Sequence, residues 1–290
     1  MDISQTVQSI FENEFQQGSL FKPPLGDACR YAIEGGQKLR PKILLDLAGT
    51  SSGAKDFSIF IEYLHSASLV VDDLPCMDNA LERRGKPALY LKYGQSNAQL
   101  VAGKLQLASL YHLYRGIRKL PPNLVNRVEN YINGQISDLY NGQYSDLDRK
   151  RLNSLPPREK ADKLIKMVEF KTGSLFAITL YLAQVWRIKN ISRKLDEETI
   201  DSYLDKAHKA GLSLGILYQI IDDIRDSNSD SNSNDESSIN LVHNLEKWEL
   251  INLFNRHVRQ LKITSNGFYL SFNTIAQLII GMIGQFKLFI

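Results

Sequence analysis

Apolar residues recur at helical spacing along almost the whole chain. In the run from Gln99 to Ile117, Val101, Leu105 and Ala108 follow one another at intervals of three or four residues, which is the period of an α-helix. No Asn-Gly or Asp-Gly pair stands between alternating apolar and polar runs, and the proline pairs at 23–24, 121–122 and 156–157 mark helix boundaries. The sequence therefore predicts an all-α protein.

Nothing along the chain separates it into domains. We find no tandem repeat and no Gly- or Pro-rich linker, and 290 residues of which 43% are hydrophobic can fill one large core or two small ones. We therefore expect a single helical domain over residues 1–290. The segment 227–238, rich in Ser, Asn and Asp, predicts a mobile loop. Residues 275–290 predict a terminal core helix, since Gln277, Gln285 and Lys287 interrupt a run too short to span a membrane.

Composition and charge narrow the classes of function. The net charge of +3 is small and the basic residues are scattered, so nucleic acid is not an expected partner. The two cysteines, Cys29 and Cys76, form neither a disulfide framework nor a zinc pattern, which favours a reducing compartment. The N-terminus lacks a basic start followed by an apolar stretch, so we expect a cytoplasmic protein.

Two acidic clusters are the most informative feature, and each closes an apolar run. A single acidic run is usually a solvated helix end, but the preceding stretches 63–71 and 210–221 lack the lysines and glutamates of a solvated helix. The carboxylates are thus expected to face an interior. The first cluster contains Asp72, Asp73 and Asp78, and the second contains Asp222, Asp223 and Asp226.

Carboxylates packed this closely require cations. Two of them about 4 Å apart repel by roughly 4 kcal/mol at an effective dielectric constant near 20, and hard oxygen ligands suit Mg²⁺. Asp222 and Asp226 are four residues apart, so they project from one helix face and can share an ion. In the first cluster the helix should bulge or end at Pro75, and either change can bring Asp78 back beside Asp72.

Basic residues that could bind phosphate lie near the acidic clusters in the sequence. Each pair alone is more often a surface charge, and Gly-Gly alone usually only turns the chain. Magnesium, however, commonly bridges carboxylates to phosphate oxygens. The candidates are Lys38 and Arg40 after Gly35-Gly36, Arg83-Arg84 after the first cluster, and Lys171-Thr172-Gly173, which interrupts a helical run.

In this order the motifs resemble those of the trans-isoprenyl diphosphate synthases, the polyprenyl synthetase family. The resemblance spans about Tyr31 to Asp226 and is most specific in the string Asp-Asp-Leu-Pro-Cys-Met-Asp-Asn followed by Arg-Arg-Gly-Lys-Pro. It is closest to geranylgeranyl and farnesyl diphosphate synthases whose first motif has four residues between carboxylate groups. The resemblance implies long helices around a deep apolar cavity.

The resemblance also implies roles for individual residues. Asp72, Asp78 and Asp222 would bind metal, typically three Mg²⁺ ions that Mn²⁺ can replace, and Asp73, Asp223 and Asp226 would complete the motifs directly or through water. An allylic diphosphate (dimethylallyl, geranyl or farnesyl) would be held by Arg83, Lys171, Thr172 and Gln219. Isopentenyl diphosphate would be held by Arg40, His65 and Arg84, with Gly36, Gln37 and Lys38 in the same loop. His65 alone would more often be a core histidine, but it lies seven residues before Asp72.

The implied reaction is ionisation of the allylic diphosphate, attack on the carbocation by isopentenyl diphosphate, and loss of a proton. Ser68 and Ala67, four and five residues before Asp72, would form part of the cavity floor. Alanine leaves room for another isoprene unit, so we expect geranylgeranyl diphosphate (C20), with farnesyl diphosphate (C15) as the alternative. Family members are usually homodimers, and residues 99–117 have enough apolar surface for the contact.

Two departures from the family pattern keep other functions open. Gln37 replaces a lysine that grips isopentenyl diphosphate, and residues 227–238 lack the lysines that usually follow the second motif. Both features favour a regulatory subunit that binds without turnover. A terpene cyclase would need no second diphosphate site, so Arg40, His65 and Arg84 count against it.

Overall fold

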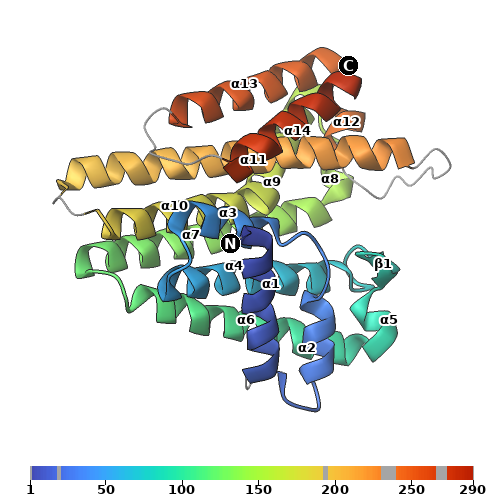
Figure 1. The fold of residues 1–290 in the computed structure, drawn as a ribbon. Coiled ribbons are helices and arrows are strands. Elements are labelled where there is room, and N and C mark those ends of the chain that lie inside the picture. Colours follow the sequence, from blue (N-terminus) through green and yellow to red (C-terminus); the bar gives the residue numbers. More distant parts are fainter. Residues whose placement is uncertain (1, 18–20, 192–194, 230–239, 266–272, 290) are drawn as a thin grey trace. The chain divides into compact units, whose positions relative to one another are not determined.

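A computed structural model of the protein describes residues 2–17, 21–191, 195–229, 240–265 and 273–289 (Figure 1). Apart from one two-residue strand pair, its regular elements are helices, so the predicted all-α class is confirmed. The chain divides into two compact units, residues 1–125 and 126–290. The expected single domain over residues 1–290 stays a prediction.

The first unit is built around α4. Its helices are α1 (Ile3–Gln17), α2 (Gly26–Ile33), α3 (Leu39–Ala48), α4 (Ser52–Asp72), α5 (Leu89–Tyr93) and α6 (Gln95–Ile117). Helix α4 is apolar nearly all round, as expected for a helix with neighbours on several sides. It packs on α2, α3 and α6, and Phe57, Phe60 and Tyr63 are fully buried.

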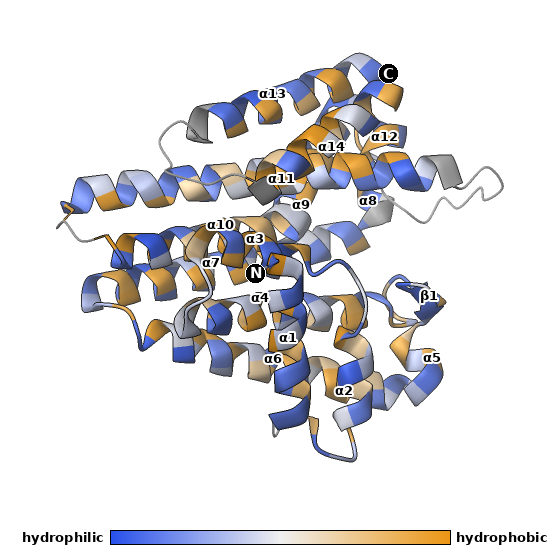
Figure 2. Cartoon of the chain, viewed as in Figure 1, coloured by the Kyte–Doolittle hydropathy of each residue, from blue (hydrophilic) through white to orange (hydrophobic). Residues whose placement is uncertain are grey.

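Helices α4 and α6 approach closely because small residues lie where they meet. A Cβ atom on Gly116 would lie 2.3 Å from the ring of Phe57, far inside van der Waals contact. Helix α6 buries Ala98, Ala102 and Ala108 as well. Its surface is not uniformly polar, and the hydropathy colouring of Figure 2 shows apolar residues at intervals along it. This close packing fixes α4, whose C-terminal end carries the first acidic cluster.

A small hairpin follows the first cluster, and the sequence pattern did not predict it. Strands β1 (Glu82–Arg83) and β2 (Lys86–Pro87) pair antiparallel. The two connecting residues, Arg84 and Gly85, both have positive φ angles, of 56° and 73°. Positive φ at both central residues is the conformation that matches the twist of a two-residue hairpin. Since Arg-Gly is an uncommon pair for this turn, the local sequence did not predict the hairpin.

The second unit contains the remaining long helices. They are α7 (Pro122–Leu147, which starts just before the boundary), α8 (Arg149–Asn153), α9 (Pro157–Val168), η2 (Glu169–Gly173, a π-helix), α10 (Ser174–Lys189), α11 (Glu197–Ser229), α12 (Leu241–Asn244), α13 (Lys247–Ser265) and α14 (Asn273–Phe289). Pro122 and Pro157 begin helices, as predicted.

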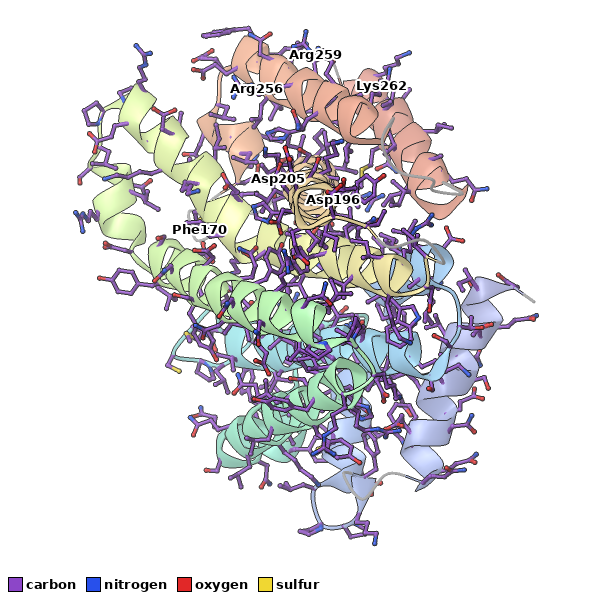
Figure 3. All side chains as sticks on the ribbon, turned by 90° about the vertical axis from the view of Figure 1, so that its left-hand side faces the viewer. Phe170, Asp196, Asp205, Arg256, Arg259 and Lys262 are labelled. Carbon is purple, nitrogen blue, oxygen red and sulfur yellow. The ribbon has the colours of Figure 1, made fainter. Side chains whose placement is uncertain are left out.

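Helix α11 packs along α10 and α13. A Cβ atom on Gly211 would lie 2.3 Å from Cα of Ala177, and one on Gly215 would lie 2.5 Å from Cα of Gly173. These glycines let α11 lie directly against η2 and α10. Figure 3 shows Phe170 in η2, and Arg256, Arg259 and Lys262 projecting from α13. The second acidic cluster, near the end of α11, is therefore held on a closely packed helix.

Two predictions about single segments have different outcomes. Residues 227–229 belong to α11, so the predicted loop begins later than expected, and residues 230–238 lie outside the described residues. The predicted terminal helix is present as α14, with Ile275, Met282 and Phe286 buried but Ile280 and Leu288 exposed. No helix within the described ranges is long and apolar enough to cross a membrane.

Candidate active site

The first acidic cluster folds back on itself where α4 ends. Asp72 is the last residue of the helix, and the backbone N–H of Asp78 donates a 2.9 Å hydrogen bond to the carbonyl of Asp72. Asn79 then takes a positive φ of 51° and donates to the carbonyl of Leu74 at 3.1 Å. Asp72 is buried and Asp78 is exposed. The expectation that the chain around Pro75 returns Asp78 to Asp72 is confirmed.

Asp73 is held by Arg83. The carboxylate is 3% exposed and accepts two hydrogen bonds from the guanidinium, with the Nε to Oδ1 distance at 2.9 Å. Burial raises the pKa of Asp73, and the hydrogen bonds from Arg83 oppose that rise. Although burial opposes its charge, the pKa of Arg83 is raised by Asp73, with smaller contributions from Asp72 and Asp78. Arg83 therefore stays charged and fixes the hairpin to the first cluster.

Cations gather around His65, which lies two helical turns before Asp72 on the same side of α4. The pKa of His65 is well below its usual value because the ring is desolvated and because Arg40, Arg84, Lys38 and Arg83 oppose a further positive charge. The imidazole is thus neutral at pH 7 and can donate one hydrogen bond. Arg40 is 8% exposed. Predicted ligands of isopentenyl diphosphate from α3, α4 and the hairpin therefore lie together.

The loop before α3 places Gln37 and Lys38 differently. Gln37 is exposed, whereas Lys38 has a positive φ of 48° and turns its ammonium inward. The Nζ atom of Lys38 donates to the carbonyls of Ile33 and Gly35, the latter at 2.7 Å, and lies 3.0 Å from Glu62. Burial lowers the pKa of Lys38, which Glu62 partly offsets. The ammonium of Lys38 is engaged within the protein and does not take the place of a lysine at position 37.

The second acidic cluster lies on one unbroken helix. Asp222 and Asp226 are four residues apart in α11 and share a face, as the spacing predicted. Between them Asp223 is 4% exposed and accepts hydrogen bonds from Gln219 Nε2 and from the backbone N–H of Leu241, both at 2.7 Å. Burial raises the pKa of Asp223 to about 6.

The Lys-Thr-Gly motif lies in the η2 π-helix, a widened turn of a kind that is frequent at functional sites. Thr172 Oγ1 donates to Gln219 Oε1 at 2.8 Å, so Thr172, Gln219 and Asp223 form one hydrogen-bonded chain. Lys171 Nζ donates to Asp146 of α7 at 2.6 Å. A Cβ atom on Gly142 would lie 2.4 Å from the backbone nitrogen of Lys171, which shows how closely α7 approaches η2.

The two acidic clusters resemble each other in how their middle carboxylates are bound. The middle carboxylates, Asp73 and Asp223, are buried and already accept hydrogen bonds from protein donors. In the first cluster the backbones of Asp72 and Asp78 are joined by a hydrogen bond. In the second cluster Asp222 and Asp226 are one helical turn apart on α11. Carboxylate oxygen is the ligand that Mg²⁺ prefers, so these carboxylates suit the ion. No three acidic, His or Cys side chains among the described residues already form a metal-binding group.

Sequence reasoning missed two buried carboxylates that contact the predicted binding residues. Glu62 of α4 lies 3.0 Å from Lys38 and 3.6 Å from Arg84, and Asp146 of α7 binds Lys171. Glu62 was detectable as a charge directly before the apolar stretch 63–71. Asp146 carried no local signal, because its partner lies 25 residues away. Ala67 and Ser68 lie on α4, where Ala67 is fully buried and Ser68 donates to the carbonyl of His65.

These helices and motifs define an all-helical protein of the isoprenoid synthase class. A geranyltransferase of Legionella pneumophila has the same fold, with a TM-score of 0.77 at 21% identity over 98% of this chain and 94% of that one. A geranyltransferase of Helicobacter pylori, complexed with magnesium and isoprenyl diphosphate, gives a TM-score of 0.72 at 24% identity over 99% of this chain and 98% of that one.

The chain belongs to the polyprenyl synthetase family, whose model matches residues 22–258, and the resemblance stated from the motifs is thereby confirmed. The geranylgeranyl diphosphate synthase of Pantoea ananas is 31% identical over 211 residues, which are 67% of this chain and 62% of that protein. The chain thus matches about three fifths of the length of this relative.

Proposed function

We propose that this protein is a trans-prenyltransferase that condenses isopentenyl diphosphate with an allylic diphosphate. The observation that carries the proposal is the group of cations around neutral His65 beside the carboxylates of the first cluster. A diphosphate needs such cations, and a divalent metal needs such carboxylates. The name of the Pantoea ananas relative and the ligands of the Helicobacter pylori structure support the same reaction.

Each group of residues has a task in this proposal. Arg40, His65 and Arg84 bind the diphosphate of isopentenyl diphosphate, and Arg83, Lys171, Thr172 and Gln219 bind the allylic diphosphate. Magnesium would be held by Asp72, Asp78, Asp222 and Asp226, where it supplies positive charge to the departing diphosphate. Asp73 and Asp223 keep Arg83 and Gln219 in position. Cations fixed before the reaction stabilise the leaving group without reorganising.

We also propose C20 as the product length, with C15 as the alternative. The support is Ala67, a small residue on α4 five positions before Asp72. A farnesyl, geranyl or dimethylallyl primer remains compatible with this proposal. The expected cytoplasmic location also stays a prediction.

A homodimer through α6 is part of the proposal. Leu100, Leu107, Tyr111 and Tyr114 are between 56% and 72% exposed. Their spacing of seven, four and three residues places them along one stripe of the helix. The opposite face of α6 packs on α4, so the stripe is a second apolar face of the same helix.

Turnover of defined substrates tests the function. Purified protein with Mg²⁺, farnesyl diphosphate and isopentenyl diphosphate is expected to release diphosphate and form a C20 product, measured by phosphate-coupled assay and mass spectrometry. Excess chelator is expected to abolish both. Full activity in chelator would contradict the proposed carboxylate and metal site. Conversion of geranylgeranyl diphosphate alone to a hydrocarbon would instead indicate a cyclase.

A regulatory subunit remains the second candidate, favoured by Gln37 and by the engagement of Lys38 with Glu62. Such a subunit would bind isoprenoid diphosphate without forming product. The same assay separates the two, because binding by calorimetry without diphosphate release supports the subunit.

A further inference from the structure

Glu62 is a buried carboxylate that none of the proposed reaction steps uses. Its side chain is 2% exposed and lies on α4, three residues before His65 and thus on the same side of the helix. A buried carboxylate is costly unless it is paired. Glu62 lies 3.0 Å from the ammonium of Lys38 and 3.6 Å from a guanidinium nitrogen of Arg84.

The two cations come from separate loops that have unusual backbone conformations. Lys38 and Arg84 are two of three described non-glycine residues with positive φ. Such conformations persist only where the surroundings fix them. Arg84 NH1 also donates to the carbonyls of Ala32 and Ile33 at 3.3 Å, and Lys38 donates to Ile33. Glu62 therefore closes a set of contacts that joins the end of α2, the start of α3 and the hairpin.

The loop is shaped to let Arg84 reach this carboxylate. A Cβ atom on Gly36 would lie 2.8 Å from Nε of Arg84 and 3.0 Å from its Cζ. Any side chain at position 36 would thus displace the guanidinium, in addition to the strain of a φ of 66°. Gly36 is better explained as room for Arg84 than as a direct substrate contact.

We propose that Glu62 is a positioning residue for the isopentenyl diphosphate site: by pairing with Lys38 and Arg84 it sets the orientation of Arg84 toward the substrate diphosphate. The role rests on the proposed function. Glu62 does not touch the reacting atoms. The carboxylate of Glu62 also pairs with the ammonium of Lys38. The groups that contact the diphosphate are then Arg40, Arg84 and neutral His65.

The variant Glu62→Gln tests this role, since it keeps the shape and removes the charge. We expect KM for isopentenyl diphosphate to rise about tenfold, because a charge-assisted contact is lost, while KM for the allylic substrate stays within about twofold. If repulsion of the substrate were the main effect of Glu62, KM for isopentenyl diphosphate would fall. A fall, or no change, would overturn the proposal.

Asp56→Asn is the matched control. Asp56 is also a buried carboxylate of α4 paired with cations, Lys119 at 2.6 Å and Arg115 at 3.3 Å, but these cations are not among the proposed ligands. It should lower stability and leave both KM values unchanged. If both variants raised the KM values for both substrates to the same extent, the role of Glu62 would be merely structural, and the proposal would be overturned.

A second variant keeps the test decisive if Glu62→Gln folds poorly. Lys38→Met removes the other partner, and its effect on KM for isopentenyl diphosphate should not add to that of Glu62→Gln in the double variant. Additive effects would contradict the proposed pair. The wild-type protein is assayed first: absence of product contradicts the proposed function itself, whereas an active wild type with an unchanged variant contradicts only the role of Glu62.

Discussion

Ala67 of α4 is fully buried, and alanine has the smallest side chain that carries a Cβ atom. In a close-packed interior each added methylene group is felt by the neighbours. We therefore propose that the size of this residue limits the length of the product. Ser68, the next residue, is partly exposed and directs its hydroxyl back to the carbonyl of His65 at 2.9 Å.

Replacing Ala67 with Tyr is expected to shorten the product from C20 to C15 or less, because the ring fills the volume that the last isoprene unit would take. Overpacking costs about 1–3 kcal/mol of stability, so thermal unfolding is measured beside product mass. Ser68→Ala adds no bulk on the same helix and should leave the product length unchanged. A folded Ala67→Tyr enzyme that still makes C20 would refute this account of chain length.

At the scale of elements, α1, α4 and α6 are joined by a buried histidine. His112 of α6 is 1% exposed and lies 3.2 Å from Glu14 of α1 and 3.3 Å from Asp56 of α4. Burial alone would lower the pKa of His112, but the hydrogen bonds and charges of Asp56 and Glu14 raise it above its usual value. Asp56 is in turn paired with Lys119 and Arg115. The imidazole, when protonated, thus ties three helices of the first unit together.

This tie makes stability depend on pH. Because the pKa of His112 is raised in the folded state, its contribution is complete below about pH 6.5 and is lost as pH rises through the folded pKa. We expect urea unfolding to show wild-type stability declining above pH 6.5 relative to His112→Gln. Burial lowers the pKa of His65, His208 and His257, so the titration of these three histidines changes stability below pH 6.5 rather than above it. Parallel curves for both proteins above pH 6.5 would exclude the tie.

At the scale of the whole molecule, the exposed stripe on α6 bears on assembly. A contiguous apolar surface on a folded protein commonly marks an interface. A stable dimer needs about 800 Å² from each partner, which a helix of 23 residues with its flanks can supply. The stripe lies on the helix that packs against α4, so dimerisation would support the element that carries the first cluster.

Leu107→Glu is expected to turn the dimer into a monomer, because a carboxylate buried in an apolar interface loses its hydration without gaining a partner. Light scattering after size exclusion measures the mass directly. Leu91 of α5 is also half exposed but lies outside the stripe, so Leu91→Glu is the matched control and should stay dimeric. A wild-type monomer, or a Leu107→Glu dimer, would contradict the α6 interface.

The sequence alone determined what depends on local spacing. Helical periodicity and proline positions predicted the all-α class, the turn at Pro75 returned Asp78 to Asp72 as expected, and four-residue spacing placed Asp222 and Asp226 on one face. The motifs were read as belonging to the polyprenyl synthetase family, and the family match over residues 22–258 confirms this reading. The family resemblance depends on the order of motifs between Tyr31 and Asp226, and each of the other inferences uses residues within a few turns of one another.

The tertiary structure alone decided which partners the candidate residues have. It pairs Glu62 with Lys38 and Arg84, Lys171 with Asp146, and Asp223 with the backbone of Leu241. It also places a hairpin at Arg84-Gly85, in which Arg84 has a positive φ that a non-glycine residue rarely takes. The side-chain contacts named here join residues 18 to 25 positions apart. Such contacts arise from the packing of whole helices, which no local pattern of residues encodes.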